Sequence, residues 1–160
     1  MKFAADTGAL LSLACSDVFE LIVKHHTFAA TDEVIKELKQ FALYEDFLGR
    51  KAKEVENIIE IEKPLQLLSL NIEAAELSIF SLGKENKYII LTDDTHAARI
   101  AQEKIKLQTK PSFFVFILMY NQGIISKEQL IHNINLVAKQ RKLMTGSLYE
   151  YVQKLIETFI

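Results

Sequence analysis

Short apolar runs of strand length alternate along the chain with longer segments whose apolar residues recur three and four positions apart. The short runs predict strands over residues 1–5, 27–30, 57–62, 88–91 and 107–109. The longer segments predict helices over 9–15, 17–24, 71–84, 94–104, 112–121 and 127–139, with two more that begin at 32 and at 147, the last running to Ile160. Strands that alternate with helices are typical of an α/β fold. We expect a three-layer α/β/α sandwich with a central parallel sheet of about four to five strands.

Several segments carry more specific local signals. Asn71 is expected to cap the helix that follows it, and Ser126 with Gln129 should form a capping box. Residues 44–55 are helical in character and strongly charged, and we interpret them as an exposed helix or arm. The segment 57–62 alternates isoleucine with acids, which predicts a marginal, half-exposed strand.

Length and composition are those of one ordinary globular domain. The 160 residues are 49% hydrophobic and 25% charged, and the chain has no repeat, low-complexity tract or interdomain linker. We expect a single domain over 1–160, with C-terminal helices at 126–160 packed on it. The net charge of −2 argues against nucleic-acid binding through a global basic field, but it is compatible with a local basic strip beside an acidic site.

The sequence contains few other signals. The single Cys15 excludes an intramolecular disulfide, and no Cys/His cluster has the spacing of a zinc site. No secretory signal is visible, and the longest apolar run, 113–120, is too short to cross a bilayer. We therefore expect a cytoplasmic protein that does not contact a membrane. We interpret His25, His26 and His132 as surface residues.

The stretch 88–99 is the strongest candidate for a functional site. Its apolar strand ends abruptly in Thr92, Asp93 and Asp94, and residues compatible with a helix follow. In a parallel α/β sheet, ligands and catalytic groups gather beyond the C-terminal ends of the strands. A simpler interpretation is that one of the two aspartates caps the following helix, because Asp is a favoured N-cap. That interpretation explains one carboxylate and leaves the other open.

Three further acids occur in comparable settings. Asp6 also follows a predicted strand, so a parallel sheet places it on the same edge as Asp93 and Asp94, and close to them if the first and fourth strands are neighbours. Glu37 and Glu76 stand among apolar residues of their helices, where an acid is costly unless it is paired or binds a cation. Each acid alone could be structural, but a coincidence of all of them is less expected.

A cluster of carboxylates without soft ligands is suited to a hard cation, Mg²⁺ or Mn²⁺. Such an ion, held by a few acids and several waters, activates water and neutralises charge on a phosphoryl group. Nothing in one sequence separates a metal ligand from a general base.

The acids stand in an ordered set of motifs. The first strand runs into Asp6-Thr7, Glu37 lies in Val-Ile-Lys-Glu-Leu, Glu76 begins Glu-Leu-Ser-Ile-Phe-Ser-Leu-Gly, and residues 93–99 read Asp-Asp-Thr-His-Ala-Ala-Arg. This order resembles the PIN domain, a family of metal-dependent ribonucleases, and above all its prokaryotic branch of predicted nucleic-acid-binding PIN-like proteins. The resemblance covers nearly the whole chain.

The resemblance implies a PIN-like fold and an endoribonuclease that hydrolyses RNA phosphodiester bonds with Mg²⁺ or Mn²⁺. In that reading Asp6, Glu76 and Asp94 hold the metal, and Glu37 and Asp93 are further ligands or position water. The resemblance also implies supporting positions, which are Thr7, Thr92, Arg99 and Thr109.

Basic residues near this site have two interpretations. Arg99, a little more than one helical turn after Asp94, could orient a carboxylate by a bidentate pair or contact a substrate phosphate. We favour the pair with a carboxylate, because so many acids need charge balance. Other cations could contact the RNA backbone or could simply be solvated, and these are Lys36, Lys39, Lys139, Arg141 and Lys142.

The expected partners follow from the same resemblance. RNA is the implied substrate, and among PIN-like proteins many are toxins bound by a small antitoxin protein, many are dimers, and others process ribosomal RNA. A rival from another class is a non-catalytic PIN-like module that binds nucleic acid or protein, with the apolar helix 113–120 at a protein interface. The presence of acids in all four motifs argues against this rival.

Overall fold

The computed structural model describes residues 1–142 and 146–159, and Ile160, where we expected the last helix to end, lies outside them. The strands are β1 (Lys2–Ala5), β2 (Thr27–Ala30), β3 (Glu60–Ile61), β4 (Ile89–Leu91) and β5 (Thr109–Lys110). The helices are α1 (Thr7–Ala14), α2 (Phe19–His25), α3 (Asp32–Ala42), α4 (Phe47–Glu56), α5 (Ala74–Asn86), α6 (Thr95–Ile105), α7 (Phe113–Asn121), α8 (Lys127–Gln140) and α9 (Ser147–Phe159). The predicted α/β class is confirmed.

The strands form one parallel sheet in the order β3-β2-β1-β4-β5. Strand β1 lies between β2 and β4, with Phe3 beside Phe28 on one side and Ala5 beside Leu91 on the other. The first and fourth strands are therefore neighbours, which was the condition for bringing the predicted acids together.

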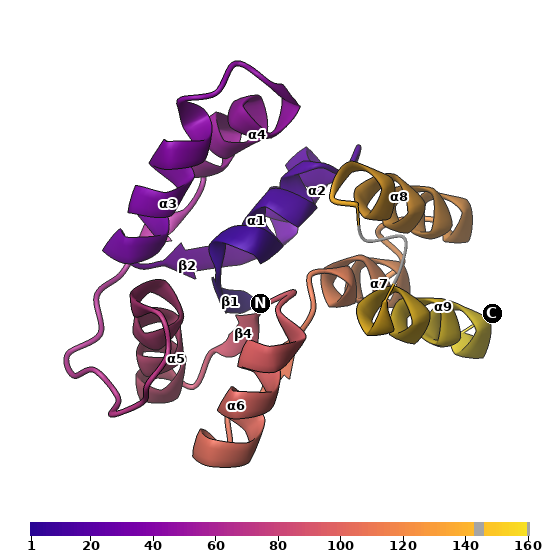
Figure 1. Ribbon diagram of the computed structural model, residues 1–160. Coiled ribbons are helices and arrows are strands. Elements are labelled where there is room, and N and C mark those ends of the chain that lie inside the picture. Colours follow the sequence, from indigo (N-terminus) through magenta and orange to yellow (C-terminus); the bar gives the residue numbers. More distant parts are fainter. Residues whose placement is uncertain (143–145, 160) are drawn as a thin grey trace.

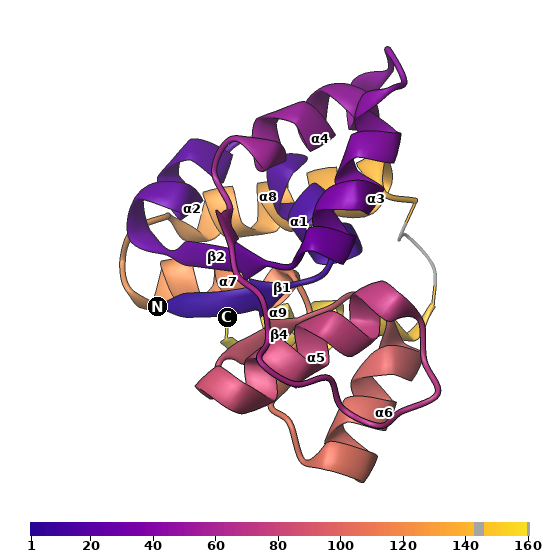
Figure 2. The ribbon, with the colours of Figure 1, turned by 90° about the vertical axis from the view of Figure 1, so that its left-hand side faces the viewer.

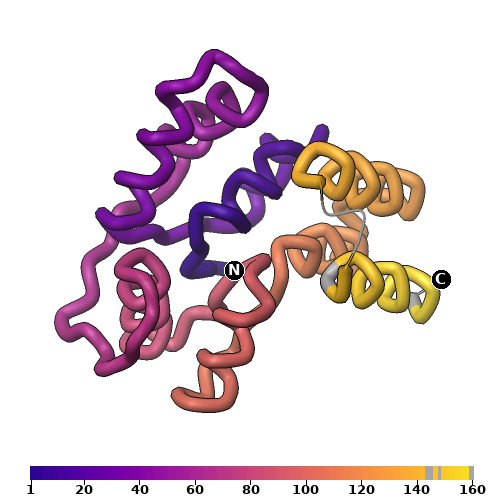
Figure 3. Tube along the Cα trace, viewed as in Figure 1, coloured from indigo at the N-terminus to yellow at the C-terminus, as the bar shows by residue number. Residues whose placement is uncertain are grey.

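Helices cover both faces of the sheet, as in a three-layer sandwich. Figure 2 shows α1, α2, α3 and α4 above the strands and α5 and α6 below them. Helices α7, α8 and α9 form a group at one side of the molecule (Figure 1). Figure 3 follows the chain from its N-terminus at the centre to the C-terminal helices at this edge. No helix in the described part of the chain is long and apolar enough to cross a membrane.

One aromatic cluster of the core surrounds Phe3 of β1. Its ring stacks on Phe28 at 5.8 Å between centroids and meets Phe114 edge-on at 6.4 Å. The ring of His26 also packs edge-on against Phe3, at 5.8 Å. His26 is only 5% exposed, so its interpretation as a surface residue is wrong. Burial lowers the pKa of this histidine, which favours the neutral ring in the core.

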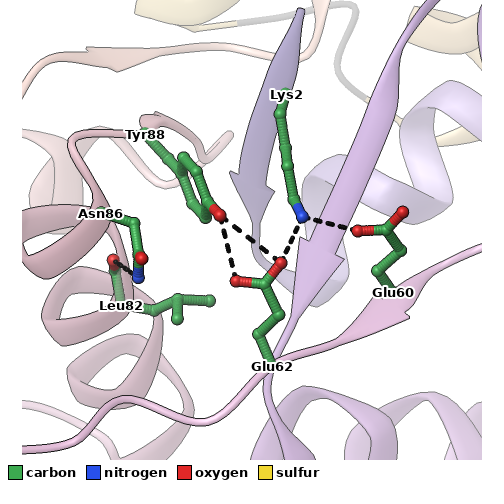
Figure 4. A network of polar contacts seen from close by, with 6 residues as sticks. All are labelled: Lys2, Glu60, Glu62, Leu82, Asn86 and Tyr88. Carbon is green, nitrogen blue, oxygen red and sulfur yellow. Dashed lines mark hydrogen bonds and ion pairs between the residues drawn. The ribbon is translucent and has the colours of Figure 1, made fainter.

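A polar network ties the short edge strand β3 to the sheet (Figure 4). Lys2 of β1 forms ion pairs with Glu60 and Glu62, and Tyr88 donates a hydrogen bond to Glu62 at 3.2 Å. These carboxylates raise the pKa of Lys2. Both residues of β3 are exposed, as its marginal pattern predicted, so these contacts add to a short backbone ladder.

Two local predictions need correction. Asn71 does not cap α5, because that helix begins only at Ala74, with Glu73 in the N-cap position. The segment 44–55 is not an exposed arm, since α4 packs on α1 and α3 and its Ala52 and Val55 are fully buried. The charged residues of α4 lie on the solvent side of that buried stripe. The capping box of α8, by contrast, is present as predicted.

Candidate active site

The carboxyl ends of β1 and β4 lie where the strand order reverses. The chain passes from β1 to β2 on one side of the sheet, and β4 and β5 extend it on the other. In open parallel sheets, ligands bind in the crevice at such a switch point. Asp6 directly follows β1, and its backbone N–H donates to Leu91 of β4 at 3.1 Å. Asp93 and Asp94 lie two and three residues after Leu91. The topology therefore brings the three aspartates to one edge.

A cleft of about 350 Å³ opens at this edge. All five acids predicted from the sequence line it, together with Glu73, which sequence reasoning missed. The full lining is Asp6, Thr7, Gly8, Glu37, Glu73, Ala75, Glu76, Asp93, Asp94 and Arg141. Glu73 lies at the N-cap of α5, and its position three residues before Glu76 was the available signal.

Each of the three aspartates bonds to the start of a different helix. Asp6 accepts a hydrogen bond from Ala9 of α1 at 2.7 Å. Asp94 caps α6 by accepting from the amides of His96 and Ala97, at 2.9 and 3.0 Å. The simpler interpretation, that one aspartate of the pair caps the next helix, is therefore right for Asp94. In Asp94 both bonds engage Oδ1, so the other oxygen remains for a ligand.

Asp93 is held differently, by Ser112 at the start of α7. The Ser112 backbone N–H donates to Oδ1 at 2.7 Å, and the Ser112 hydroxyl donates to Oδ2 at 2.8 Å. Both carboxylate oxygens thus have a protein donor, and Ser112 is fully buried. Asp93 is the most firmly oriented acid of the cleft.

The two glutamates come from facing helices, Glu37 from α3 and Glu76 from α5. The buried hydroxyls of Thr31 and Ser78, 2.6 Å apart, link the N-terminus of α3 to α5. Thr7, a predicted supporting residue, donates a hydrogen bond from its hydroxyl to Glu37. These contacts explain how acids from separate helices reach the cleft that Asp6 enters from β1.

Burial and repulsion between neighbouring carboxylates disfavour the ionised forms of Asp6 and Glu76 in the cleft. Burial raises the pKa of Asp6 from 3.8 to about 7, and the carboxylates of Asp93 and Glu76 raise it further. Hydrogen bonds from Thr92 and Ala9 act in the opposite direction. Burial also raises the pKa of Glu76, and the neighbouring acids add to it. A cation in the cleft would relieve this repulsion.

The donors fit a hard divalent cation in kind, because every candidate ligand is a carboxylate. Among the residues that the structure describes, however, no three acid, histidine or cysteine groups converge closely enough to hold a metal ion. Hydrogen bonds with other groups of the protein already engage Asp6, Asp93, Asp94 and Glu37. The acids share a cleft, but their side chains would have to come closer together to share an ion.

The remaining predicted residues fall into separate places. Thr92 is buried and accepts a hydrogen bond from the Asp94 amide at 3.2 Å. Arg99 makes no ion pair with a carboxylate in the described residues, contrary to the reading we favoured. Its guanidinium lies 3.3 Å from the ring of His96. Thr109, which accepts from Gln102 at 2.6 Å, lines a second cleft with Arg99.

Of the five basic candidates, Arg141 alone lines the acidic cleft. Its Nε is buried and has no hydrogen-bond partner among the described residues. The other four are exposed and do not line it, and these are Lys36, Lys39, Lys139 and Lys142. The return of α8 toward the start of α1 brings Arg141 there, next to Gly8.

Fold and site define an open α/β domain with a carboxylate cleft at its switch point. A family model described as a PIN domain matches residues 2–158, so the chain belongs to the PIN domain family. PIN domains are generally nucleases and typically depend on divalent metal ions. No curated protein and no solved structure matches the chain significantly.

Proposed function

We propose that this protein is a metal-dependent endoribonuclease that hydrolyses RNA phosphodiester bonds in the acidic cleft. The observation that carries this proposal is the gathering of Asp6, Glu37, Glu76 and Asp94 in one cleft at the switch point. Membership of a family that consists generally of nucleases supports it.

In this proposal Asp6, Glu76 and Asp94 hold Mg²⁺ or Mn²⁺. The bound ion supplies an activated water and charge neutralisation at the phosphoryl group. Asp94 contributes the oxygen that its helix cap leaves available, while Asp93, fixed by Ser112, orients the loop after β4. Glu37 positions the attacking water or completes the ligand set.

Arg141 carries a fixed positive charge and lines the cleft together with the acids. Its unpartnered Nε–H is suited to a phosphate oxygen, since guanidinium groups bind phosphates through directed hydrogen bonds. We propose that it contacts the scissile phosphate and offsets the repulsion between the RNA backbone and the acids.

The test is cleavage of a fluorescently labelled single-stranded RNA with Mn²⁺, by the parent and by Asp94→Asn. We expect the variant to lose at least about a hundredfold in rate, because a metal ligand contributes several kcal/mol to the transition state. Asn retains the cap of α6, so the fold should persist. The matched control is Asp46→Asn, because Asp46 also caps a helix, α4, by accepting from the Gly49 amide at 2.8 Å, and it lies outside the cleft.

Equal rates for the parent and Asp94→Asn would refute the assignment. Calorimetry with Mn²⁺ tests the nuclease against its rival, a non-catalytic binding module. This measurement needs no knowledge of the RNA. Metal binding by the parent that Asp6→Asn and Asp94→Asn both abolish supports the nuclease. The antitoxin partner and the homodimer stay predictions from the family resemblance.

A further inference from the structure

A second cleft adjoins the acidic one and has a different chemical character. It measures about 410 Å³ and lies among α6, the β5–α7 connection and α9. Asp93 lines both clefts, so the two meet at the loop that follows β4. A chain molecule bound at the acids could therefore continue directly into this second cleft.

The second cleft is lined by cations where the first is lined by acids. Arg99 of α6 and Lys110 of β5 both face it. Neither forms an ion pair with an acid in the described part of the chain. Lys110 lies over the ring of Phe114, 5.3 Å from its centroid, and Asp93 is the acid in the lining. The positive charge of the cleft is thus available to an anionic ligand.

An aromatic side chain and an amide complete the lining. Tyr151 of α9 lines the cleft and is 47% exposed. The next residue, Val152, is fully buried and packs α9 on the core. Gln102 donates to Thr109 at 2.6 Å, and both residues add polar groups to the lining. Two cations, an accessible aromatic ring and polar groups match the phosphate, the flat base and the base edge of a nucleotide.

We propose that this second cleft binds the nucleotide next to the scissile phosphate of a single-stranded RNA. Arg99 and Lys110 contact its phosphate, and its base stacks on Tyr151. The proposal rests on the proposed ribonuclease function for the identity of the ligand. It also predicts a preference for unpaired RNA, because a base can reach Tyr151 only when it is not stacked in a duplex. Arg99 then serves the substrate phosphate, which is the second of its two interpretations.

The test measures binding of a fluorescein-labelled single-stranded oligoribonucleotide by anisotropy, in EDTA and again with Ca²⁺, over a range of salt concentrations. We expect Arg99→Gln and Lys110→Gln each to weaken binding and to reduce the salt slope by about one. Tyr151→Ala should weaken binding about fivefold or more, because one stacked base is lost. A duplex of the same sequence should bind less tightly than the single strand.

Matched controls lie outside the cleft. Lys104→Gln removes a charge from the exposed end of α6, and Tyr44→Ala removes a tyrosine that is 66% exposed beyond α3. Both should bind as the parent does. Binding by the three cleft variants that equals that of these controls would overturn the proposal, as would failure of the parent to bind under both conditions.

The outcome is separable from that of the proposed function. Loss of RNA binding in the three cleft variants supports the nucleotide site even when the parent shows no Mn²⁺-dependent cleavage. Loss of cleavage in Asp94→Asn together with unchanged binding in the cleft variants supports the nuclease and removes the nucleotide site.

Discussion

The raised pKa of Asp6 makes a prediction that needs no substrate: Asp6→Asn should stabilise the metal-free protein at neutral and alkaline pH. The substitution removes the charge and keeps the shape. Asn is as good an N-cap as Asp, so the hydrogen bond from the Ala9 amide should survive. The change therefore isolates the cost of an ionised carboxylate in this cleft.

The sign follows from proton binding. Between about pH 4 and pH 7 the folded protein keeps a proton on Asp6 that the unfolded chain has released, so the contribution of Asp6 to the free energy of unfolding falls as pH rises. The difference between 3.8 and about 7, at about 1.4 kcal/mol for each pH unit, corresponds to about 4 kcal/mol once pH exceeds the folded-state value. The variant should match the parent near pH 4 and exceed it by up to that amount at pH 8.

The assay is denaturant unfolding, followed by circular dichroism in EDTA, at a series of pH values. Asp46→Asn is the control, because Asp46 caps α4 with the same geometry but is exposed, and its effect should stay within about 0.5 kcal/mol. Parallel stability curves for the parent and Asp6→Asn would refute the argument. Added Mn²⁺ should then stabilise the parent and leave Asp6→Asn unchanged.

Three further substitutions test local features of the structure. In Gly49→Ala the new Cβ would lie 1.9 Å from the carbonyl oxygen of Tyr44, so denaturant unfolding should show that the free energy of unfolding falls by about 3 kcal/mol. In Gly8→Ala the atom nearest to the new Cβ is 3.7 Å away, so this substitution should be tolerated. Ser112→Ala removes the hydroxyl that donates to Asp93, so the free energy of unfolding should fall by about 1.5 kcal/mol and RNA cleavage should become slower. An unchanged cleavage rate would show that the backbone bond from Ser112 alone orients Asp93.

The order of strands and helices could be predicted because each element shows its own periodicity. Predictions failed where a position depends on distant neighbours. The exposure of α4 was misjudged because Ala52 and Val55 form a narrow apolar stripe on a charged helix. His26 was misplaced because its burial depends on contact with Phe3, more than twenty residues away in sequence.

Among the site residues, too, the positions set by local sequence could be predicted and those set by distant elements could not. Acids that follow strand ends were found because a parallel sheet dictates their common edge. The place of Arg141 depends on how α8 returns toward α1, and Arg99 lines a cleft that residues of α9 share. Neither is visible in local sequence, so the favoured pairing of Arg99 with a carboxylate was a judgement of charge balance alone.

Helix capping explains where the three aspartates lie, but it does not explain their charge. A neutral asparagine would cap α1 or α6 about as well and would avoid the repulsion that raises the pKa of Asp6. The chain instead gathers five carboxylates and Glu73 in one cleft, at a cost to the stability of the metal-free protein. A protein that only needed stable helix ends would gain nothing from this arrangement. A cation bound by the ionised groups would offset this cost. The higher stability of metal-free Asp6→Asn and its loss of metal binding should therefore appear together.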